Sequence, residues 1–278
     1  MARILVVANE TIGGSSLIEA VRRRVEQGDA EFVVCVPRTR PRDGNIVYDD
    51  FVFQAAQIRV DLARKFMREQ MGVEIIGEVG DPDPYTAAMD AVREYDPDEI
   101  IVSTKPATVS GWLRRDLVER IGDATGLPVE HVVTDLDREG LPFGVVLVVA
   151  NRTASSDRLL ERLREKADEA DRPQLFIVVI PQEGGEGVHA HRARGQLNQF
   201  LDRARAASLL AAGMIADPDP FSATKNALQL FRIDEIVIST LGPERSGWLR
   251  ADLVGRIRKA TTVPVEHVIA TRETADVS

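Results

Sequence analysis

Short apolar runs alternate with amphipathic stretches along the whole chain. Residues 4–8 form a nearly continuous apolar run, which is typical of a strand covered on both faces. Residues 16–27 then carry apolar positions at helical spacing, and Gly28 ends the predicted helix. The same alternation continues to the end of the chain. Strands that alternate with helices predict parallel sheets with helices on both faces.

The two halves of the chain have the same predicted order of elements. In the first half, the strands cover residues 4–8, 32–36, 73–79, 99–103 and 129–133. The helices between them cover residues 16–27, 51–70, 84–94 and 111–124. In the second half, the strands lie near residues 145–150, 175–179, 209–216, 235–239 and 265–270. Right-handed crossovers then leave few ways to wind each sheet.

About half of the chain is an internal repeat. Residues 77–134 and 213–270 align without a gap, and about half of the paired positions are identical. The repeated blocks are Asp-Pro-Asp-Pro, Ser-Gly-Trp-Leu-Arg and Pro-Val-Glu-His-Val, which begin in the first copy at Asp81, Ser110 and Pro128. A period near half the chain length predicts two similar domains rather than a solenoid. We place these domains at residues 1–135 and 143–271, joined by a polar linker with Gly and Pro.

Composition narrows the class of protein. Of the 278 residues, 44% are hydrophobic and 28% are charged, as in ordinary globular proteins. The net charge of −9 disfavours sequence-independent nucleic-acid binding, which depends on Lys and Arg. No apolar run approaches the roughly 20 residues of a membrane span, and the single cysteine permits no disulfide within the chain. We therefore expect a cytoplasmic protein with neither a nucleic-acid nor a membrane partner.

Candidate ligand-binding residues lie in the loops after the first and fourth strands of each copy. Doubly wound sheets bind ligands beyond the carboxyl ends of their strands, where the winding direction reverses. In the first copy the candidates are Asn9, Thr11, Ser103, Thr104, Ser110, Gly111 and Arg114. In the second copy they are Asn151, Thr153, Ser239, Thr240, Gly242, Ser246, Gly247 and Arg250.

The chemistry of these residues fits a small anion or a mononucleotide. Ser110 and Ser246 are placed to cap a helix. Arg114 and Arg250 follow within about one turn and offer fork-shaped sets of donors to a phosphate or carboxylate. The alternative is that the repeated block serves packing alone, since a repeat preserves core residues as readily as sites.

The residues around these loops resemble a known family in both halves. Gly80-Asp81-Pro82 follows the third strand, an Asp-x-Ile pattern opens the fourth, and a Pro-Val strand closes the copy. These features are similar to the universal stress protein family, here in a tandem form. The resemblance implies a Rossmann-like fold of the adenine nucleotide alpha hydrolase type, with a five-stranded parallel sheet in each domain. It also implies an intramolecular pseudo-dimer with scope for further homo-oligomers. Better-studied family members bind ATP or other adenine nucleotides, and others act through partners.

The nucleotide motif of that family is altered in both copies. Nucleotide-binding members carry Gly-x₂-Gly-x₉-Gly-(Ser/Thr) after the fourth strand. Ser103 and Ser239 stand at the first glycine, and Pro106 replaces the second one in the first copy, whereas the second copy keeps Gly242. An Asp follows in both copies where the family has Ser or Thr, and its carboxylate would repel a triphosphate. We therefore expect a diverged pocket, with ATP and AMP as the cofactors to test.

We expect a non-enzymatic stress-response protein that binds a nucleotide or another small anionic ligand. The repeated residues assemble no nucleophile–base pair, acid–base dyad or metal shell, and Asp83 and Asp219 are interpreted as helix caps rather than metal ligands. Two alternatives remain open. One is a scaffold that acts through protein–protein association. The other is a weak ATP-hydrolysing or adenylating enzyme, because Gly13-Gly14-Ser15-Ser16 resembles a phosphate loop.

Overall fold

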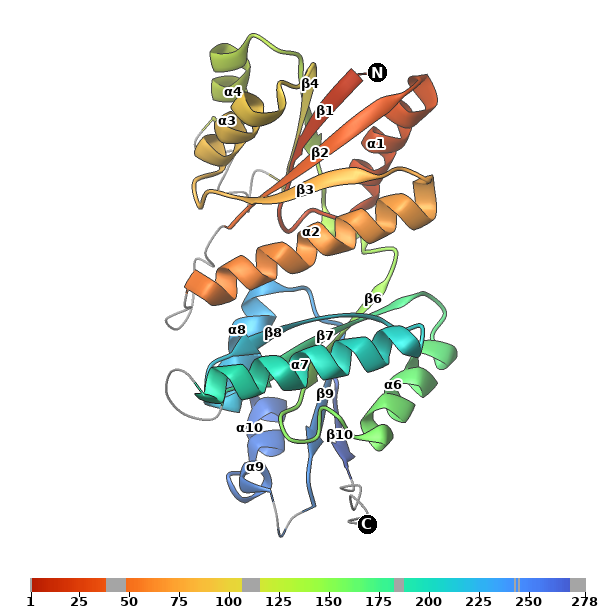
Figure 1. Cartoon of the computed structure of the whole chain (residues 1–278), viewed down its shortest axis with the longest axis vertical. Helices are drawn as coiled ribbons and strands as arrows, with labels where there is room; N and C mark the ends of the chain where they lie inside the picture. The colour runs from red at the N-terminus through yellow and green to blue at the C-terminus, as the bar shows by residue number, and fades with distance from the viewer. Residues whose placement is uncertain are drawn as a thin grey trace. The chain divides into compact units, whose positions relative to one another are not determined.

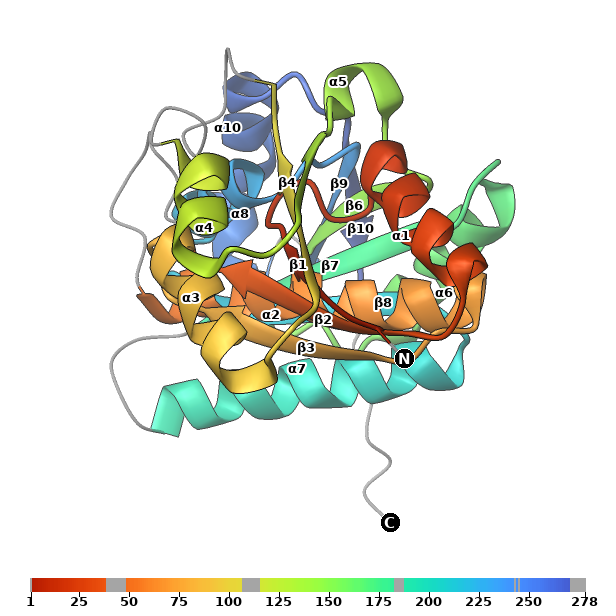
Figure 2. The same ribbon diagram turned by 90° about the horizontal axis from the view of Figure 1, so that it is seen from above.

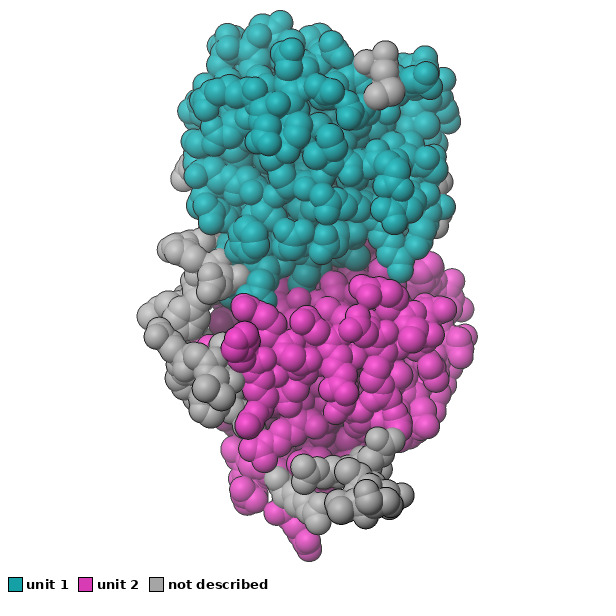
Figure 3. Space-filling model, in the orientation of Figure 1, with its two compact units in different colours: residues 1–42, 48–142 teal, residues 43–47, 143–278 magenta. Residues whose placement is uncertain are grey.

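The computed structural model describes residues 2–38, 49–106, 116–182, 188–242, 244 and 246–270. The described residues up to Pro142 form one compact unit and those from Phe143 form another, called unit 1 and unit 2 (Figure 3). Residues 136–142, which the sequence analysis assigned to the linker, therefore group with unit 1. No helix in the described part of the chain combines the length and the apolar character needed to cross a membrane.

Unit 1 alternates strands with helices (Figure 1). Its strands are β1 (Ala2–Val7), β2 (Ala30–Pro37), β3 (Ile75–Gly80), β4 (Glu99–Thr104) and β5 (Val129–Val133). Its helices are α1 (Ser15–Gln27), α2 (Asp49–Met71), α3 (Pro84–Tyr95), α4 (Leu117–Thr125) and α5 (Leu136–Glu139).

Unit 2 repeats this order of elements. Its strands are β6 (Gly144–Val149), β7 (Gln174–Pro181), β8 (Leu210–Ala216), β9 (Glu235–Thr240) and β10 (Val265–Ile269). Its helices are α6 (Asp157–Glu169), α7 (Val188–Ala206), α8 (Pro220–Leu230), α9 (Gly247–Arg250) and α10 (Leu253–Ala260).

Both units contain a five-stranded sheet in which every strand pair is parallel. The strand orders are β3-β2-β1-β4-β5 and β8-β7-β6-β9-β10. The winding direction therefore reverses between β1 and β4 in unit 1 and between β6 and β9 in unit 2. The predicted fold class, a doubly wound parallel α/β sheet in each half, is confirmed.

Helices cover both faces of each sheet, because successive side chains of a strand point to opposite faces. In β1, Ile4 and Val6 pack with α1 and α2, whereas Leu5 and Val7 pack with α3 and α4. Figure 2 shows α1 on one side of this sheet and α3 with α4 on the other. A strand buried on both faces needs apolar residues at every position, which explains the continuous apolar run in the sequence.

The fourth helix of the repeat differs from the prediction. In unit 2 it is divided into α9 and α10, and Asp252 between them has a φ of 48°. Asp116, just before α4, has the same φ of 48°. A left-handed residue cannot continue a right-handed helix, so the predicted helix over residues 111–124 does not run through Asp116, and α4 begins at Leu117. In unit 1, residues 111–115 of the predicted helix lie outside the described residues.

The interpretation of the repeated aspartates as helix caps is confirmed. Asp83 accepts a hydrogen bond from the backbone N–H of Thr86 at 3.0 Å, and Asp219 accepts one from Ser222 at 3.0 Å. The prolines that follow occupy the first turns of α3 and α8, where no backbone donor is needed. These carboxylates therefore cap the N-termini of α3 and α8.

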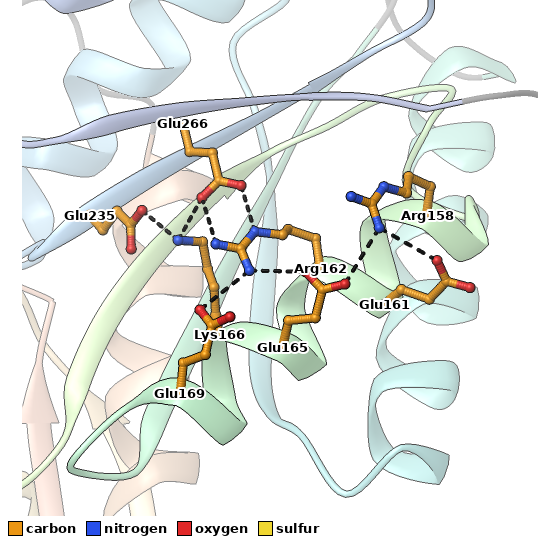
Figure 4. A network of polar contacts seen from close by, with 8 residues as sticks. All are labelled: Arg158, Glu161, Arg162, Glu165, Lys166, Glu169, Glu235 and Glu266. Atoms are coloured by element: carbon orange, nitrogen blue, oxygen red, sulfur yellow. Dashed lines mark hydrogen bonds and ion pairs between the residues drawn. The ribbon is translucent and has the colours of Figure 1, made fainter.

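Charged side chains fasten α6 to the amino ends of two strands (Figure 4). Lys166 Nζ lies 2.5 Å from Glu235, the first residue of β9, and 2.7 Å from Glu266 in β10. Arg162 Nε lies 2.6 Å from the other oxygen of Glu266. Burial alone raises the pKa of Glu266, but the hydrogen bonds from Arg162 and Lys166 outweigh burial and hold that pKa below its usual range.

Unit 1 has a matching cluster. Arg24 of α1 forms ion pairs with Glu99 at the start of β4 and with Glu130 in β5. Its side chain is only 13% exposed, so these pairs are less screened than surface pairs. The repeated acidic positions of the strands thus serve the attachment of a helix in both units.

Candidate functional site

Unit 2 contains a cavity of about 310 Å³ at the reversal of its strand order. This volume lies at the lower end of the range for small-molecule sites, about 300–1,000 Å³. The lining residues are Asn151, Arg152, Thr153, Ser239, Thr240, Leu241, Ser246, Gly247, Trp248 and Arg250. The structure therefore brings together all the candidate residues of the second copy except Gly242, which is in the same loop as Leu241 but does not line the cavity.

The loop after β6 is tied to the neighbouring strands. Asn151 Nδ2 donates a hydrogen bond to the carbonyl of Pro181 at 3.2 Å, and Thr153 Oγ1 donates to the carbonyl of Ser239 at 3.0 Å. In unit 1, Asn9 Nδ2 and Thr11 Oγ1 make the same bonds at 3.0 and 3.3 Å. The repeated Asn-x-Thr pattern thus fixes the position of the loop, and it leaves the residue between them to face the cavity.

The end of β9 supplies two hydroxyl groups with different partners. Thr240 Oγ1 donates to the carbonyl of Leu241 at 2.9 Å and lies 2.8 Å from Nε2 of His267. Because a hydroxyl has one hydrogen, Nε2 of His267 must be the donor of the second bond. Ser239 is 1% exposed, and its Oγ has no partner among the described residues. Ser239 therefore contributes a buried hydroxyl without a partner among the described residues, in a residue that also lines the cavity.

His267 itself is partly buried. Burial lowers its pKa, and the charge of Arg258 lowers it further. The neutral imidazole, protonated on Nε2, is therefore favoured at neutral pH. His131 makes the equivalent contact with Thr104 in unit 1, where the two atoms are 2.9 Å apart.

The start of α9 forms another wall of the cavity. Ser246 Oγ accepts a hydrogen bond from the backbone N–H of Leu249 at 3.2 Å, which confirms the predicted helix cap. Gly247 and Trp248 follow it along the wall. Arg250 is exposed, and its Nη1 lies 3.5 Å from the carbonyl of Glu244.

Among the described residues that line the cavity there are two arginines and no carboxylate. Arg152 and Arg250 therefore make the lining electropositive, as a site for an anion requires. The sequence analysis missed Arg152, because the second copy has Arg where the first has Glu10. Its position between Asn151 and Thr153, which both hold the loop, was the available signal.

The candidate site of unit 1 is only partly described. Asn9, Thr11, Ser103 and Thr104 are buried at the carboxyl ends of β1 and β4. The other candidates of the first copy, Ser110, Gly111 and Arg114, lie outside the described residues.

The segment that resembles a phosphate loop is bound to a carboxylate of the chain itself. Glu139 of α5 accepts hydrogen bonds from Ser15 Oγ at 2.8 Å and from the N–H and Oγ of Ser16 at 3.0 and 2.7 Å. It also accepts one from the N–H of Asp135 at 3.1 Å. Both hydroxyl groups and the N–H of Ser16 at the start of α1 are thus engaged by Glu139.

The fold and the cavity define a class of protein built from two doubly wound α/β units, with a ligand-sized cavity at the switch point of unit 2. No model of a protein family matches the chain. No curated protein matches it either.

The chain is similar to several solved structures at low identity and with TM-scores below 0.5. A universal stress protein from Archaeoglobus fulgidus DSM 4304 is 14% identical over 98% of this chain and 97% of that chain, with a TM-score of 0.34. The adenylation, ketoreductase and pseudo-Asub structure of a keto acid-selecting NRPS module is 11% identical over 87% of this chain and 27% of that chain, with a TM-score of 0.23. A ketoreductase domain from the bacillaene assembly line is 14% identical over 87% and 59%, with a TM-score of 0.24. At these TM-scores the likeness carries no functional argument.

Proposed function

We propose that this chain is a non-enzymatic protein of the tandem universal stress type that binds a small anionic ligand, such as a nucleotide, in the cavity of unit 2. One observation carries the proposal. Ser239 lines a cavity whose other lining residues include Arg152 and Arg250, and its buried Oγ has no partner among the described residues. A buried hydroxyl without a partner is costly, and a phosphate oxygen would satisfy it while the arginines balance the charge.

We propose no catalysis, because none of the described hydroxyl groups of the cavity donates its hydrogen to a base. The hydroxyl hydrogen of Thr240 is donated to a backbone carbonyl, and His267 donates to Thr240 rather than accepting from it. Ser239 has no base bonded to it among the described residues. In the segment that resembles a phosphate-binding loop, the hydroxyl of Ser15 donates a hydrogen bond to Glu139. We therefore expect no ATP turnover above that of a sample without protein, measured as released phosphate.

Thermal unfolding with a ligand panel tests binding. The panel consists of ATP, AMP, a cyclic nucleotide and inorganic phosphate. A ligand at a hundred times its dissociation constant should stabilise the folded chain by about 2.7 kcal/mol and raise its unfolding temperature. If no member of the panel changes the unfolding temperature, the proposal is wrong and the scaffold alternative is favoured.

Matched arginine variants locate the site. Arg152→Gln with Arg250→Gln removes both charges from the cavity lining, and we expect affinity to fall by roughly tenfold or more, since each charge-assisted hydrogen bond contributes about 1.5–3 kcal/mol. Arg205→Gln is the control, because the Arg205 side chain on α7 of the same unit is 80% exposed and pairs with Asp202. An equal loss in the control would indicate a general effect of net charge instead of a site.

A further inference from the structure

The carboxyl end of the fourth strand differs between the two copies by one hydrogen bond. In unit 1, Oγ of Ser103 lies 3.1 Å from Oγ1 of Thr134, and both side chains are buried. The matching residue in unit 2 is Ala270, which has no hydroxyl, and Oγ of Ser239 has no partner among the described residues. Buried polar groups are nearly always paired. Ser103 therefore has a partner within the chain, whereas the hydroxyl of Ser239 has none among the described residues.

A second exchange accompanies the first. Gly14 precedes α1, and a Cβ atom on Gly14 would lie 2.1 Å from Cγ2 of Thr134. At the matching helix start, unit 2 has Ser156, together with the smaller Ala270 at the position of Thr134. Oγ of Ser156 is also buried without a partner among the described residues. The pair Gly14 and Thr134 in unit 1 thus corresponds to the pair Ser156 and Ala270 in unit 2. Only the first pair provides a hydrogen-bond partner for the serine at the end of the fourth strand.

The two copies also differ in charge at the loop after the first strand. In unit 1, Glu10 forms an ion pair with Lys105, so the two charges neutralise each other. The matching residues of unit 2 are Arg152 and Leu241, and both line the cavity. A carboxylate at this place repels an anion, whereas a guanidinium attracts it.

From these three differences we propose that each chain binds one anionic ligand, in unit 2 alone. In the described part of unit 1, Ser103, Thr104 and Glu10 contact other side chains of the unit, whereas Oδ1 of the buried Asn9 has no partner among the described residues. The inference rests on the proposed function and adds to it the stoichiometry and the residues that determine it, which are Ser156, Ala270 and Arg152. On this proposal the duplication has produced one ligand-binding unit and one unit in which Ser103, Thr104 and Glu10 are engaged by other side chains.

Titration calorimetry of the full chain with AMP, ATP and inorganic phosphate tests the inference. We expect one ligand per chain. Ser156→Gly with Ala270→Thr gives unit 2 the pair of unit 1, and we expect affinity to fall roughly tenfold or more, because Ser239 then acquires an internal partner. The reciprocal double variant, Gly14→Ser with Thr134→Ala, should leave the affinity of the unit 2 site unchanged.

A second variant does not depend on repacking the interior. Arg152 is exposed, so Arg152→Glu should fold normally, as thermal unfolding without ligand will verify, and should weaken binding by roughly tenfold or more. The matched exchange in unit 1, Glu10→Arg, should not weaken binding. Two equivalent ligands per chain, or binding that is lost with the unit 1 variants instead, would overturn this inference but leave the proposed function in place. If no probe binds the native chain, the proposed function falls and this inference falls with it.

Discussion

At the scale of single residues, side chains far apart in the sequence decide the chemistry of each unit. Glu139 contacts Ser15 and Ser16 at the start of α1, and its carboxylate accepts hydrogen bonds from both hydroxyl groups and from the N–H of Ser16. Burial alone raises the pKa of Glu139, but the hydrogen bonds from Ser16, Ser15 and Asp135 outweigh it and lower the pKa. The carboxylate therefore acts as a cap supplied from outside the helix.

Glu139→Gln should destabilise unit 1 by about 1 kcal/mol, because the charge-assisted bonds become neutral ones at a partly exposed place. The pKa of Glu139 is lower in the folded chain than in the unfolded chain. Its stabilisation is therefore fully present above the unfolded pKa, and it is lost as the pH falls through the folded pKa. Urea denaturation between pH 7 and pH 3 should show a smaller loss of stability in Glu139→Gln than in the native chain. Glu26→Gln, on the exposed face of α1, is the control and should keep the native pH profile.

At the scale of elements, the break between α9 and α10 determines where the cavity wall ends. Asp252 adopts a left-handed conformation there, and Asp116 adopts it in unit 1. Aspartate tolerates this conformation better than most residues, and glycine adopts it without strain. The two copies have kept this backbone conformation although about half of their paired residues differ. The left-handed aspartate before the helix is therefore a feature that both copies share.

Asp252→Val should destabilise unit 2 by about 1–2 kcal/mol, since a β-branched residue is strained at positive φ. Asp252→Gly should be at least as stable as the native chain. Urea denaturation of the two variants measures the difference. If both substitutions cost the same, the carboxylate and not the backbone conformation is what matters at this position.

At the scale of the whole molecule, each unit has an apolar core of its own. In unit 2, Val146 and Val148 of β6 pack with Leu159 of α6 and Phe200 of α7, and all four side chains are buried. The size of this unit also suits independent folding, since common domains have about 100–150 residues.

Residues 143–278 expressed alone should therefore fold with a cooperative thermal transition and bind the same ligand as the full chain with similar affinity. Circular dichroism and titration calorimetry check the two parts of this expectation. Residues 1–142 are the matched control and should fold without binding the ligand. An unfolded or aggregated isolated unit 2 would show that its core depends on the rest of the chain.

Much of the fold follows from the sequence, because strands buried on both faces are read directly from apolar runs such as residues 4–8. The gathering of Asn151, Ser239 and Ser246 at one cavity also follows, since the switch point of a doubly wound sheet is set by topology. The role of Glu139 does not follow, because Ser15 and Ser16 lie more than a hundred residues away from it in the sequence. The break at Asp252 does not follow either, because its neighbours are good helix formers and the φ of one residue leaves no periodic signal.

The charged cluster of Arg162, Lys166, Glu235 and Glu266 lies at the amino ends of β9 and β10, whereas Ser239 and Thr240 face the cavity from the carboxyl end of β9. In these strands, the residues that bind α6 and the residues that line the cavity thus lie at opposite ends. The anchoring end can stay constant while residues at the other end change. The cavity residues of unit 2 could accordingly be substituted to change its ligand specificity while the ion pairs that hold α6 against the sheet are retained.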